Sequence, residues 1–394
     1  MNVSTEKLSR FVLRQDGSLV DDDECNRGEQ HKFLRNALSS GHLNVMLGSG
    51  FSFSVVPTLG GRESWFRFVE EQMTSDSTND IWMVILKLLK AEYFRSIMLP
   101  LEKVDADPGQ LDAVRALMNL IHRRGTTTIP KRINLFTTNY DPLLEKSLEH
   151  YAVAYNDGFI GRERPSFSPS AFSRLQYEQS LFMEYSTQVA TANVIKLHGS
   201  LTWASSEDGL IYSKTSDTLH LCLAGCEAIR SMAILDEVKK MAEKDFSDND
   251  LENLKFIASK VDDASKTALE RFNRQYDSTL CIVNPTKKKF METVLERSYY
   301  DLLRIYSNEL DRNNSILLTF GFSFADEHIR ELTIRAAKSN PKLLIFISCF
   351  SHKDALDMEG YFNGCGNVSL FVAEDKNKHI GLDAFAKGLE CLSR

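Results

Sequence analysis

The feature that most constrains the fold of this chain is a regular alternation of short apolar segments with amphipathic ones over its last third. The pattern predicts strands at 280–283, 316–320, 343–348 and 368–372, and helices at 290–310, 325–338, 352–361 and 382–392. This βαβα order favours a parallel sheet with helices on both faces, because parallel strands are joined by helical crossovers. The chain is therefore predicted to be an α/β protein.

Three strand-to-helix junctions earlier in the chain end in small or polar residues. An apolar segment at 43–47 is followed by the turn Gly-Ser-Gly-Phe-Ser at 48–52, one at 133–137 by Asn139 and Asp141, and one at 194–197 by His198 and Gly199. Parallel α/β sheets bind their ligands outside the carboxyl ends of the strands. The three junctions are therefore predicted to form one nucleotide site that contains a histidine.

The remaining segments do not follow this pattern. Residues 1–40 are polar, and we expect them to form an N-terminal arm that could serve in assembly. Residues 41–394 are expected to form one domain around the sheet, with helical insertions at about 62–130 and 224–276.

The composition is that of an ordinary globular protein, with 394 residues, 43% of them hydrophobic and 26% charged. A formal net charge of -7 and a pI of about 5.8 argue against direct nucleic-acid binding through a basic surface. The first twenty residues lack an apolar core of secretory length, and no run approaches the ~18 apolar residues that cross a bilayer. A cytoplasmic protein without membrane contact is expected.

The seven cysteines are an odd number scattered over a long chain, which fits reduced thiols. Cys222 and Cys226 form one close pair, but neither a second pair nor a histidine at finger spacing follows them. No metal site is therefore expected.

The glycine turn at 48–52 has two interpretations. Its backbone N–H groups could approach a pyrophosphate, with the hydroxyl of Ser52 as a further donor. Phe53 stands where the usual dinucleotide fingerprint has its third glycine, and the alternative is simply a tight turn. The candidate cofactor-binding residues of this turn are Gly48, Ser49, Gly50, Phe51 and Ser52.

The next two junctions also have a structural and a functional interpretation. Asp141 precedes Pro142, and this pair is a favourable helix start, so that capping alone could explain the aspartate. Asn139 lies just before this start, and its amide needs a partner from either the protein or a ligand. His198 could be a structural histidine or a base, and Gly199 leaves room beside it for another group.

Two later strand ends carry weaker candidates. Gly321 and Ser323 follow a predicted strand and precede a helix, which can form a further anion-receptive helix start. Asp326 is interpreted as the cap of that helix. Asn284 follows another predicted strand, where it could bond a ribose hydroxyl or merely make a turn.

Taken in order, five motifs resemble the sirtuin family, and specifically its prokaryotic sirtuin-like branch. They are the glycine turn at 48–52, Thr-Thr-Asn-Tyr-Asp at 137–141, Leu-His-Gly at 197–199, Ile-Val-Asn at 282–284 and Gly-Phe-Ser at 321–323. The resemblance covers roughly 42–61, 131–156, 191–213 and 278–338. It implies a Rossmann-like domain that binds NAD.

The resemblance also implies roles for single residues. Asn139 would face the ribose next to nicotinamide, Asp141 would hold the nicotinamide carboxamide, and His198 would be the base that acts on the ribose hydroxyls. The other implied contacts are to the phosphates, from Gly48, Gly50 and Ser52, and to the adenosine half, from Asn284, Gly321 and Ser323.

The chain departs from the deacylases of this family in two ways. Their zinc module has two close cysteine pairs after the His-Gly step, whereas this chain has one pair and a helical segment. Their glutamine before the asparagine is Thr138 here. The Thr-Asn-Tyr-Asp form is similar to the branch that hydrolyses NAD in anti-phage defence, some members of which assemble with a HerA-like ATPase.

We therefore expect an NAD glycohydrolase that releases nicotinamide and ADP-ribose, depletes NAD in anti-phage defence, and is controlled by assembly. A homo-oligomer is expected, with a HerA-like ATPase as a candidate partner. An NAD-dependent protein deacylase and a non-catalytic sensor of NAD or ADP-ribose remain alternatives. The motifs do not specify the trigger, the oligomeric state, or a linear against a cyclic product.

Overall fold

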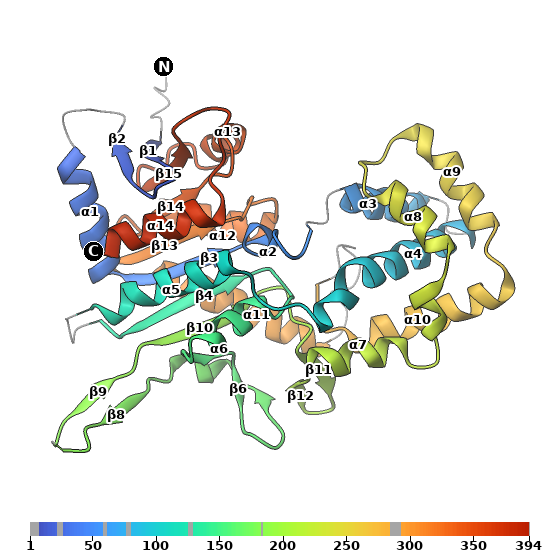
Figure 1. Cartoon of the computed structure of the whole chain (residues 1–394), viewed down its shortest axis with the longest axis horizontal. Helices are drawn as coiled ribbons and strands as arrows, with labels where there is room; N and C mark the ends of the chain where they lie inside the picture. Colours follow the sequence, from blue (N-terminus) through green and yellow to red (C-terminus); the bar gives the residue numbers. More distant parts are fainter. Residues whose placement is uncertain are drawn as a thin grey trace.

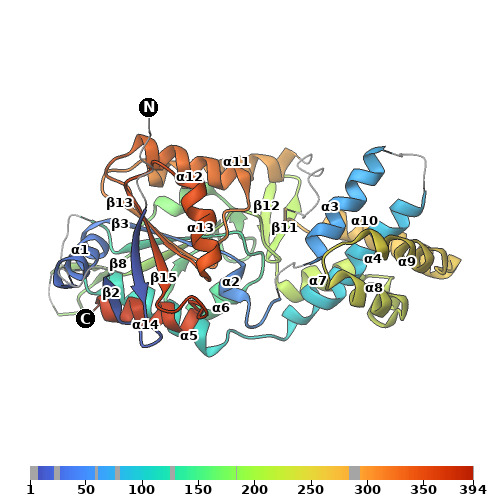
Figure 2. The same ribbon diagram turned by 90° about the horizontal axis from the view of Figure 1, so that it is seen from above.

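The computed structural model describes residues 8–21, 27–57, 61–75, 80–124, 129–182, 184–283 and 293–393. It has two lobes, a large one built around a sheet and a smaller one made of helices (Figure 1). Seen from above, helices lie on both sides of the sheet, and the helical lobe extends from one end of it (Figure 2). The predicted α/β, Rossmann-like class is confirmed.

The main sheet has nine described strands in the order β2-β1-β15-β14-β13-β3-β4-β10-β5. Its described pairings are parallel, except that β2 is antiparallel to β1. The strands are β1 (Ser9–Leu13), β2 (Leu19–Asp21), β3 (His42–Leu47), β4 (Arg132–Thr137), β5 (Ala154–Asn156), β10 (Thr191–Lys196), β13 (Ser315–Phe320), β14 (Leu344–Ser348) and β15 (Val368–Ala373). The segment predicted as a strand at 280–283 is not among them, and its Ile282 forms an isolated antiparallel bridge with Gly199 instead.

Successive residues of the central strands face opposite sides of the sheet, as strand geometry requires. In β3, Val45 and Leu47 belong to one hydrophobic core, and Met46 belongs to another. The first core also includes residues of α1 (Arg27–Ser40), α5 (Pro108–His122), α6 (Leu143–His150) and α14 (Leu382–Ser393). The second includes residues of α11 (Thr293–Leu310), α12 (Glu327–Ser339) and α13 (His352–Tyr361). Burial on both faces explains why the strands are nearly continuous apolar runs.

The helical lobe has a hydrophobic core of its own. Its helices are α3 (Gly61–Ser75), α4 (Asp80–Tyr93), α7 (Thr215–Leu223), α8 (Ile234–Ala242), α9 (Asp248–Ser259) and α10 (Asp263–Thr279), with short helical segments at Phe94–Met98, Leu99–Glu102 and Glu227–Ser231. Helices from both predicted insertions thus pack together as one lobe. Helix α5 differs, because it packs beside α14 on the sheet although it lies within the first predicted insertion.

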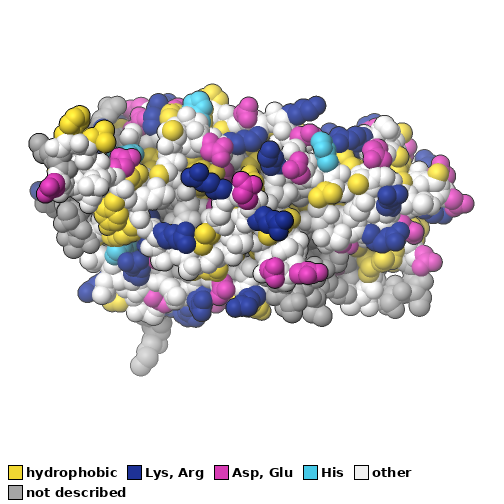
Figure 3. Space-filling view, turned by 90° about the horizontal axis from the view of Figure 1, so that it is seen from below, with side chains coloured by type: hydrophobic (Ala, Val, Ile, Leu, Met, Phe, Trp, Pro, Cys, Tyr) yellow, Lys and Arg dark blue, Asp and Glu magenta, His cyan; other side chains and the backbone are white. Residues whose placement is uncertain are grey.

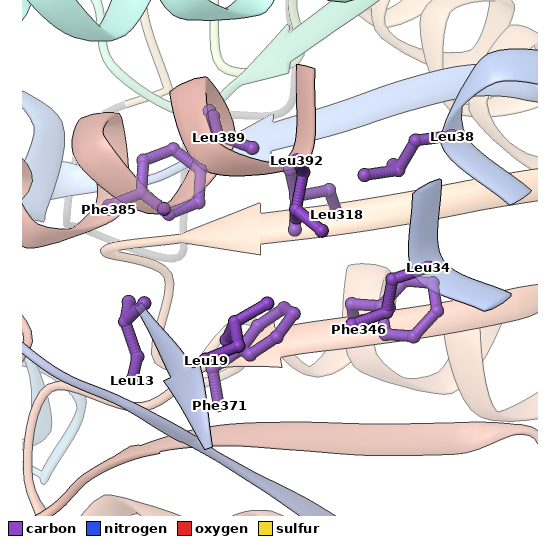
Figure 4. A pocket seen from close by; sticks show the side chains of 11 residues that line it. Leu13, Leu19, Leu34, Leu38, Leu318, Phe346, Phe371, Phe385, Leu389 and Leu392 are labelled. Atoms are coloured by element: carbon purple, nitrogen blue, oxygen red, sulfur yellow. The ribbon is translucent and has the colours of Figure 1, made fainter. Parts of the chain in front are cut away.

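The first 40 residues do not form the expected arm where the structure describes them. Strand β1 extends the sheet beside β15, with Phe11 in register with Phe371. Leu34 and Leu38 of α1 are buried in the same core. Figure 4 shows these two leucines around a small apolar cavity that side chains of β1, β2 and α14 also line. The apolar side chains of this segment therefore complete the core of the sheet lobe.

A row of buried asparagines crosses three neighbouring strands at one level. Asn44, Asn134 and Asn193 are register partners in β3, β4 and β10. The Nδ2 of Asn193 donates to Asn134 Oδ1 at 2.9 Å, and the Nδ2 of Asn134 donates to Asn44 Oδ1 at 2.8 Å. The row ends at Ser315 Oγ on one side and at the carbonyl of Phe172 on the other. A one-residue slip of any strand would break it, so the row helps to fix the register of the sheet.

Two smaller sheets lie beside the main one. One contains β6 (Phe159–Ile160), β7 (Ser166–Phe167), β11 (Trp203–Ser206) and β12 (Gly209–Tyr212), and a 3-10 helix at Pro169–Ser173 follows β7. The other is the hairpin of β8 (Tyr177–Gln179) and β9 (Ser186–Gln188), which projects from the sheet lobe in Figure 1. On the face drawn in Figure 3, basic and acidic side chains are interspersed. None of the helices in the described ranges has the length and apolar character needed to cross a membrane.

Candidate functional site

The strand order brings four of the predicted junctions to one edge of the main sheet. Strands β13, β3, β4 and β10 are neighbours and run parallel, so Gly321, Gly48, Asn139 and His198 follow their carboxyl ends in this order. The short helix α2 (Ser49–Ser52) follows β3 and lies on the side of the sheet that faces the helical lobe (Figures 1 and 2). This is the position at which parallel α/β sheets bind ligands.

Three glycines let two loops cross in contact at this edge. A Cβ on Gly48 would lie 2.3 Å from the carbonyl oxygen of Gly321, and a Cβ on Gly50 would lie 2.5 Å from Gly321 Cα. Gly321 has a φ of +62°, which favours glycine. The N–H of Gly48 donates to the Phe320 carbonyl at 3.0 Å, and the N–H of Gly50 donates to the Gly321 carbonyl at 3.1 Å. These two N–H groups, which the sequence suggested for a pyrophosphate, already have protein acceptors.

Asn139 joins the end of β4 to the glycine turn. Its Nδ2 donates to the Gly48 carbonyl and to Ser52 Oγ, both at 3.0 Å. Its backbone N–H donates to Thr137 Oγ1 at 3.0 Å. The partners that the amide was expected to need are therefore protein groups, and they fix the orientation of the side chain.

Asp141 is 5% exposed, and its Oδ1 accepts a hydrogen bond from the N–H of Leu143 at 3.1 Å. Helix α6 begins at Leu143 with Pro142 at the N-cap position, so Asp141 stabilises the helix start from one residue further out than expected. Its carbonyl accepts from Lys196 Nζ, and this ammonium also pairs with Glu145 at 2.9 Å. Burial raises the pKa of Glu145 against the opposing charge of Lys196. Sequence reasoning missed this pair, because Lys196 ends an otherwise apolar strand.

Tyr140 connects the site to the helical lobe. Its hydroxyl is hydrogen-bonded to the hydroxyl of Tyr93 in α4, and its carbonyl accepts from the N–H of Leu201 at 3.0 Å. Burial raises the pKa of Tyr93 to about 12, so this hydroxyl stays protonated at neutral pH. Tyr140, which lies between Asn139 and Asp141, is thus hydrogen-bonded directly to the helical lobe.

His198 is hydrogen-bonded across the edge to Asp326. The distance from His198 Nε2 to Asp326 Oδ2 is 2.9 Å, and the two side chains are 19% and 21% exposed. The His198 carbonyl accepts from the N–H of Val283 at 2.8 Å. Gly199 has a φ of +78°, and a Cβ there would lie 2.0 Å from the carbonyl oxygen of Cys281. The room that Gly199 leaves beside His198 is therefore occupied by the backbone at Cys281.

Asp326 has the capping role that the sequence predicted, and the bond to His198 in addition. Its Oδ1 accepts from the N–H of Ile329 at 2.9 Å at the start of α12. Burial by itself would raise the pKa of Asp326, but the hydrogen bonds from His198 and Ile329 and the charges of His198 and His328 lower it below its ordinary value. Sequence reasoning missed the bond to His198, since the sequence does not give the order of the strands in the sheet.

A cavity of about 510 Å³ lies beside the crossing of the two loops. Its volume is within the range of roughly 300–1,000 Å³ that is usual for small-molecule sites. Ser49, Gly50, Gly321 and Ser323 line it, whereas the candidates at the ends of β4 and β10 are not part of the lining. Asn284 lies outside the described residues.

Other residues that line this cavity were not predicted. They include Cys349 and Phe350 after β14, Asp354 and Tyr361 in α13, and Ile380 before α14. Cys349 and Phe350 follow a predicted strand, so the rule that ligands bind at strand ends could have suggested them. The other three belong to no motif, because their role depends on tertiary packing.

Cys222 and Cys226 lie in the core of the helical lobe. The single S–H of Cys226 has two acceptors within reach, the Cys222 carbonyl at 3.4 Å and Gln275 Oε1 at 3.2 Å from Sγ. Burial raises the pKa of Cys222 to about 12, so its thiol is protonated at neutral pH. Within the described ranges, no group of three or more His, Cys, Asp or Glu residues could hold a metal ion.

Comparison with protein families gives one match. A family model described as a SIR2-like domain matches residues 133–219. The matched segment includes Asn139, Asp141 and His198. No curated protein matches the chain. The similarity of residues 133–219 to a SIR2-like domain supports a sirtuin-like relationship of the sheet lobe and fits an NAD-dependent activity in general.

Proposed function

We propose that this protein is an NAD glycohydrolase, which breaks the bond between nicotinamide and ribose and releases nicotinamide and ADP-ribose. The observation that carries the proposal is the position of Asn139 and His198 at neighbouring strand ends, within a segment that is similar to a SIR2-like domain. The cavity of about 510 Å³ beside the glycine turn supplies room for the rest of the dinucleotide.

In this proposal the cavity holds the adenosine half of NAD. Its lining includes Ser49, Gly50, Gly321 and Ser323 as well as apolar side chains such as Met358. Apolar side chains suit the faces of a purine ring, and hydroxyls suit ribose and phosphate oxygens. Since the N–H groups of Gly48 and Gly50 have protein acceptors, we assign phosphate contact to the Ser49 hydroxyl rather than to those two backbone groups.

Asn139 is proposed to stabilise the reacting sugar through its amide oxygen. A carboxamide has two N–H donors, and Asn139 gives hydrogen bonds to the Gly48 carbonyl and to Ser52 Oγ. In the proposal, Oδ1 then faces the ligand. Breaking the nicotinamide–ribose bond develops positive charge on the sugar, and a preorganised carbonyl oxygen stabilises such charge. Ser52 accepts from Asn139, so its own proton can be donated to the substrate.

His198 is proposed to be the base, because an imidazole can accept a proton from a ribose hydroxyl or from water near neutral pH. Asp141 is proposed to contact the nicotinamide carboxamide, which would place the leaving group beside the end of β4. Fixed orientation of the sugar and its leaving group is itself a large part of such catalysis.

The test is nicotinamide release from NAD by the purified protein, with and without an acetylated-lysine peptide. We expect release without the peptide. An absolute requirement for the peptide would favour a protein deacylase. Saturable binding of NAD or ADP-ribose without any release would favour a sensor and would contradict the proposed enzyme.

We further propose that the NADase acts in anti-phage defence in the cytoplasm and that assembly controls it, either as a homo-oligomer or with a HerA-like ATPase. Two points support this: the resemblance of the Thr-Asn-Tyr-Asp run at 138–141 to that branch, and the hydrogen bond of Tyr140 to Tyr93, which links the site to the helical lobe. Light scattering and the nicotinamide assay, on the protein alone and with the product of the neighbouring gene, test it. A fully active monomer would contradict the proposal.

A further inference from the structure

One hydrogen bond spans the edge of the sheet on which the proposed chemistry depends. His198 follows β10, and Asp326 follows β13, and these strands are separated in the sheet by β3 and β4. Their side chains nevertheless meet, with Nε2 and Oδ2 2.9 Å apart. The bond therefore crosses the carboxyl ends of the two central strands, which precede the glycine turn and Asn139.

Asp326 is held in place by contacts with residues next to it in the chain. Its second oxygen, Oδ1, accepts from the N–H of Ile329 at 2.9 Å, so that the carboxylate caps α12 while it contacts His198. The loop before it is anchored by Phe324, which is fully buried and has a φ of +54°. Arg330 Nη1 donates to the Phe324 carbonyl at 2.8 Å. A buried ring in a sparsely populated backbone conformation is characteristic of a loop whose position is fixed by its surroundings.

The contact determines which nitrogen of His198 carries the proton. An ionised carboxylate can only accept, so the imidazole must donate from Nε2. In a neutral imidazole the other nitrogen, Nδ1, then has the free electron pair. The Asp326 carboxyl is ionised at neutral pH, because its pKa lies below the ordinary value.

We infer that Asp326 is a positioning residue, which holds the imidazole of His198 with Nε2 protonated and so makes Nδ1 the nitrogen that accepts a proton during NAD hydrolysis. The inference rests on the proposed function and adds the residue and the tautomer that its base requires. It gives Asp326 a second role beside the cap that its sequence position predicted.

The proton balance of the step follows from this arrangement. The bond between C1′ of ribose and the nicotinamide nitrogen breaks, and its electron pair goes to nicotinamide, which leaves as a neutral molecule. The water oxygen forms a bond to C1′ and loses a proton, which Nδ1 takes up. His198 is then an imidazolium that still donates from Nε2 to Asp326, and the carboxylate stabilises this charge until the proton returns to solvent.

The variant that separates positioning from capping is Asp326→Asn. Asparagine is as good an N-cap as aspartate, so its Oδ1 can still accept from Ile329. Its other group is an amide that donates, and it would favour the tautomer of His198 with the electron pair on Nε2. We expect kcat to fall about 10²–10⁴-fold with KM for NAD within about twofold. We expect the melting temperature to stay within a few degrees of that of the wild type.

The matched control is Asp262→Asn. Asp262 caps α10 in the helical lobe, and it accepts from the N–H of Ser265 at 2.7 Å. The substitution makes the same chemical change at the same helix position, away from His198. We expect kcat and KM to remain those of the wild type. If Asp326→Asn behaved like Asp262→Asn, Asp326 would be a cap alone and the inference would be overturned.

A measurement without substrate keeps the inference separate from the proposed function. In ¹⁵N spectra of the histidine rings, assigned with a His198→Gln variant, we expect a pyrrole-like Nε2 and a pyridine-like Nδ1 for His198. We expect the Asp326→Asn variant to lose this preference. A wild-type His198 protonated on Nδ1 would overturn the inference even in an active enzyme. A wild type that releases no nicotinamide would refute the proposed function, while the spectra would still decide whether Asp326 sets the tautomer.

Discussion

The sheet interior and the helical lobe bury different polar groups, although the sheet lobe also has a buried ion pair near its carboxyl edge, between Lys196 and Glu145 at 2.9 Å. In the sheet lobe, neutral asparagines form a row across β3, β4 and β10, with Asn134 at its centre. In the helical lobe, charged side chains form buried pairs: Arg62 with Glu92 at 2.8 Å, and Lys90 with Asp277 at 2.9 Å. The side chain of Glu92 is fully buried. Neutral hydrogen bonds thus set the register of the sheet, whereas ion pairs orient helices against one another.

The polar groups at the carboxyl edge of the sheet differ from the asparagine row in its interior. The carboxyl edge of the sheet carries the hydrogen-bonded imidazole of His198 and carboxylate of Asp326, and both are partly exposed there. The interior row cannot ionise under ordinary conditions, so a change of pH acts on the edge before it acts on the register beneath it. In the proposed mechanism, the asparagine row would keep the sheet in register while a proton moves at His198.

The largest effect is expected when side chains at the carboxyl edge of the sheet are replaced, because turnover of NAD should then be lost. We expect His198→Ala and Asn139→Ala each to lower nicotinamide release about 10²–10⁴-fold, because a positioned acid/base or charge-stabilising group is removed. Thermal melting should show that both variants fold. The control is His220→Ala, since His220 is 54% exposed in the helical lobe and pairs with Glu102. Unchanged activity in both edge variants would refute the assigned roles.

The next effect concerns the helical lobe. We expect Glu92→Ala to lower the free energy of unfolding by about 3–5 kcal/mol, because the guanidinium of Arg62 is left buried without its partner. Denaturant unfolding monitored by fluorescence measures this loss. Lys239→Ala is the control, since Lys239 forms an exposed pair with Glu243 at 3.9 Å and its loss should change stability by less than ~1 kcal/mol. Equal losses in the two variants would contradict a special role for the buried pair.

A smaller loss is expected from the asparagine row. Asn134→Ala leaves Asn44 Oδ1 without its donor and Asn193 Nδ2 without one of its acceptors. We expect a loss of about 2–3 kcal/mol in the free energy of unfolding. Asn377→Ala, at an exposed position, should stay within about 0.5 kcal/mol of the wild type. An Asn134→Ala variant as stable as this control would mean that the row does not support the sheet.

The central sheet could be predicted because its evidence is local. Strands such as β4 and β13 are apolar runs that end in turns, and the alternation with amphipathic helices indicates parallel pairing. The candidate residues at their ends follow from the same rule. The N-terminal strands were missed because β1 and β2 come from a polar segment. Strand β1 pairs with β15, 360 residues later in the chain, and β2 pairs with β1.

The parts of the site that could not be predicted depend on contacts between distant segments. The glycine turn gave no indication that Gly321 would cross it, or that its N–H groups would find carbonyl acceptors there. Likewise, Asp326 had a sufficient local explanation as a cap. Its bond to His198 required the strand order of the whole sheet, and hydrophobic periodicity contains no such information.

The smallest effect is expected in the pH dependence of stability. The pKa of Asp326 is lowered in the folded protein from its ordinary value of 3.8. The folded state therefore binds this proton less readily than the unfolded state, and the carboxylate adds stability above 3.8 that is lost as the pH falls through the lower folded value. The difference in unfolding free energy between wild type and Asp326→Asn should thus be constant near neutral pH and shrink in acid. Urea unfolding between about pH 7 and pH 3 measures it, and a difference that grows in acid would show that the charge of Asp326 does not stabilise the edge.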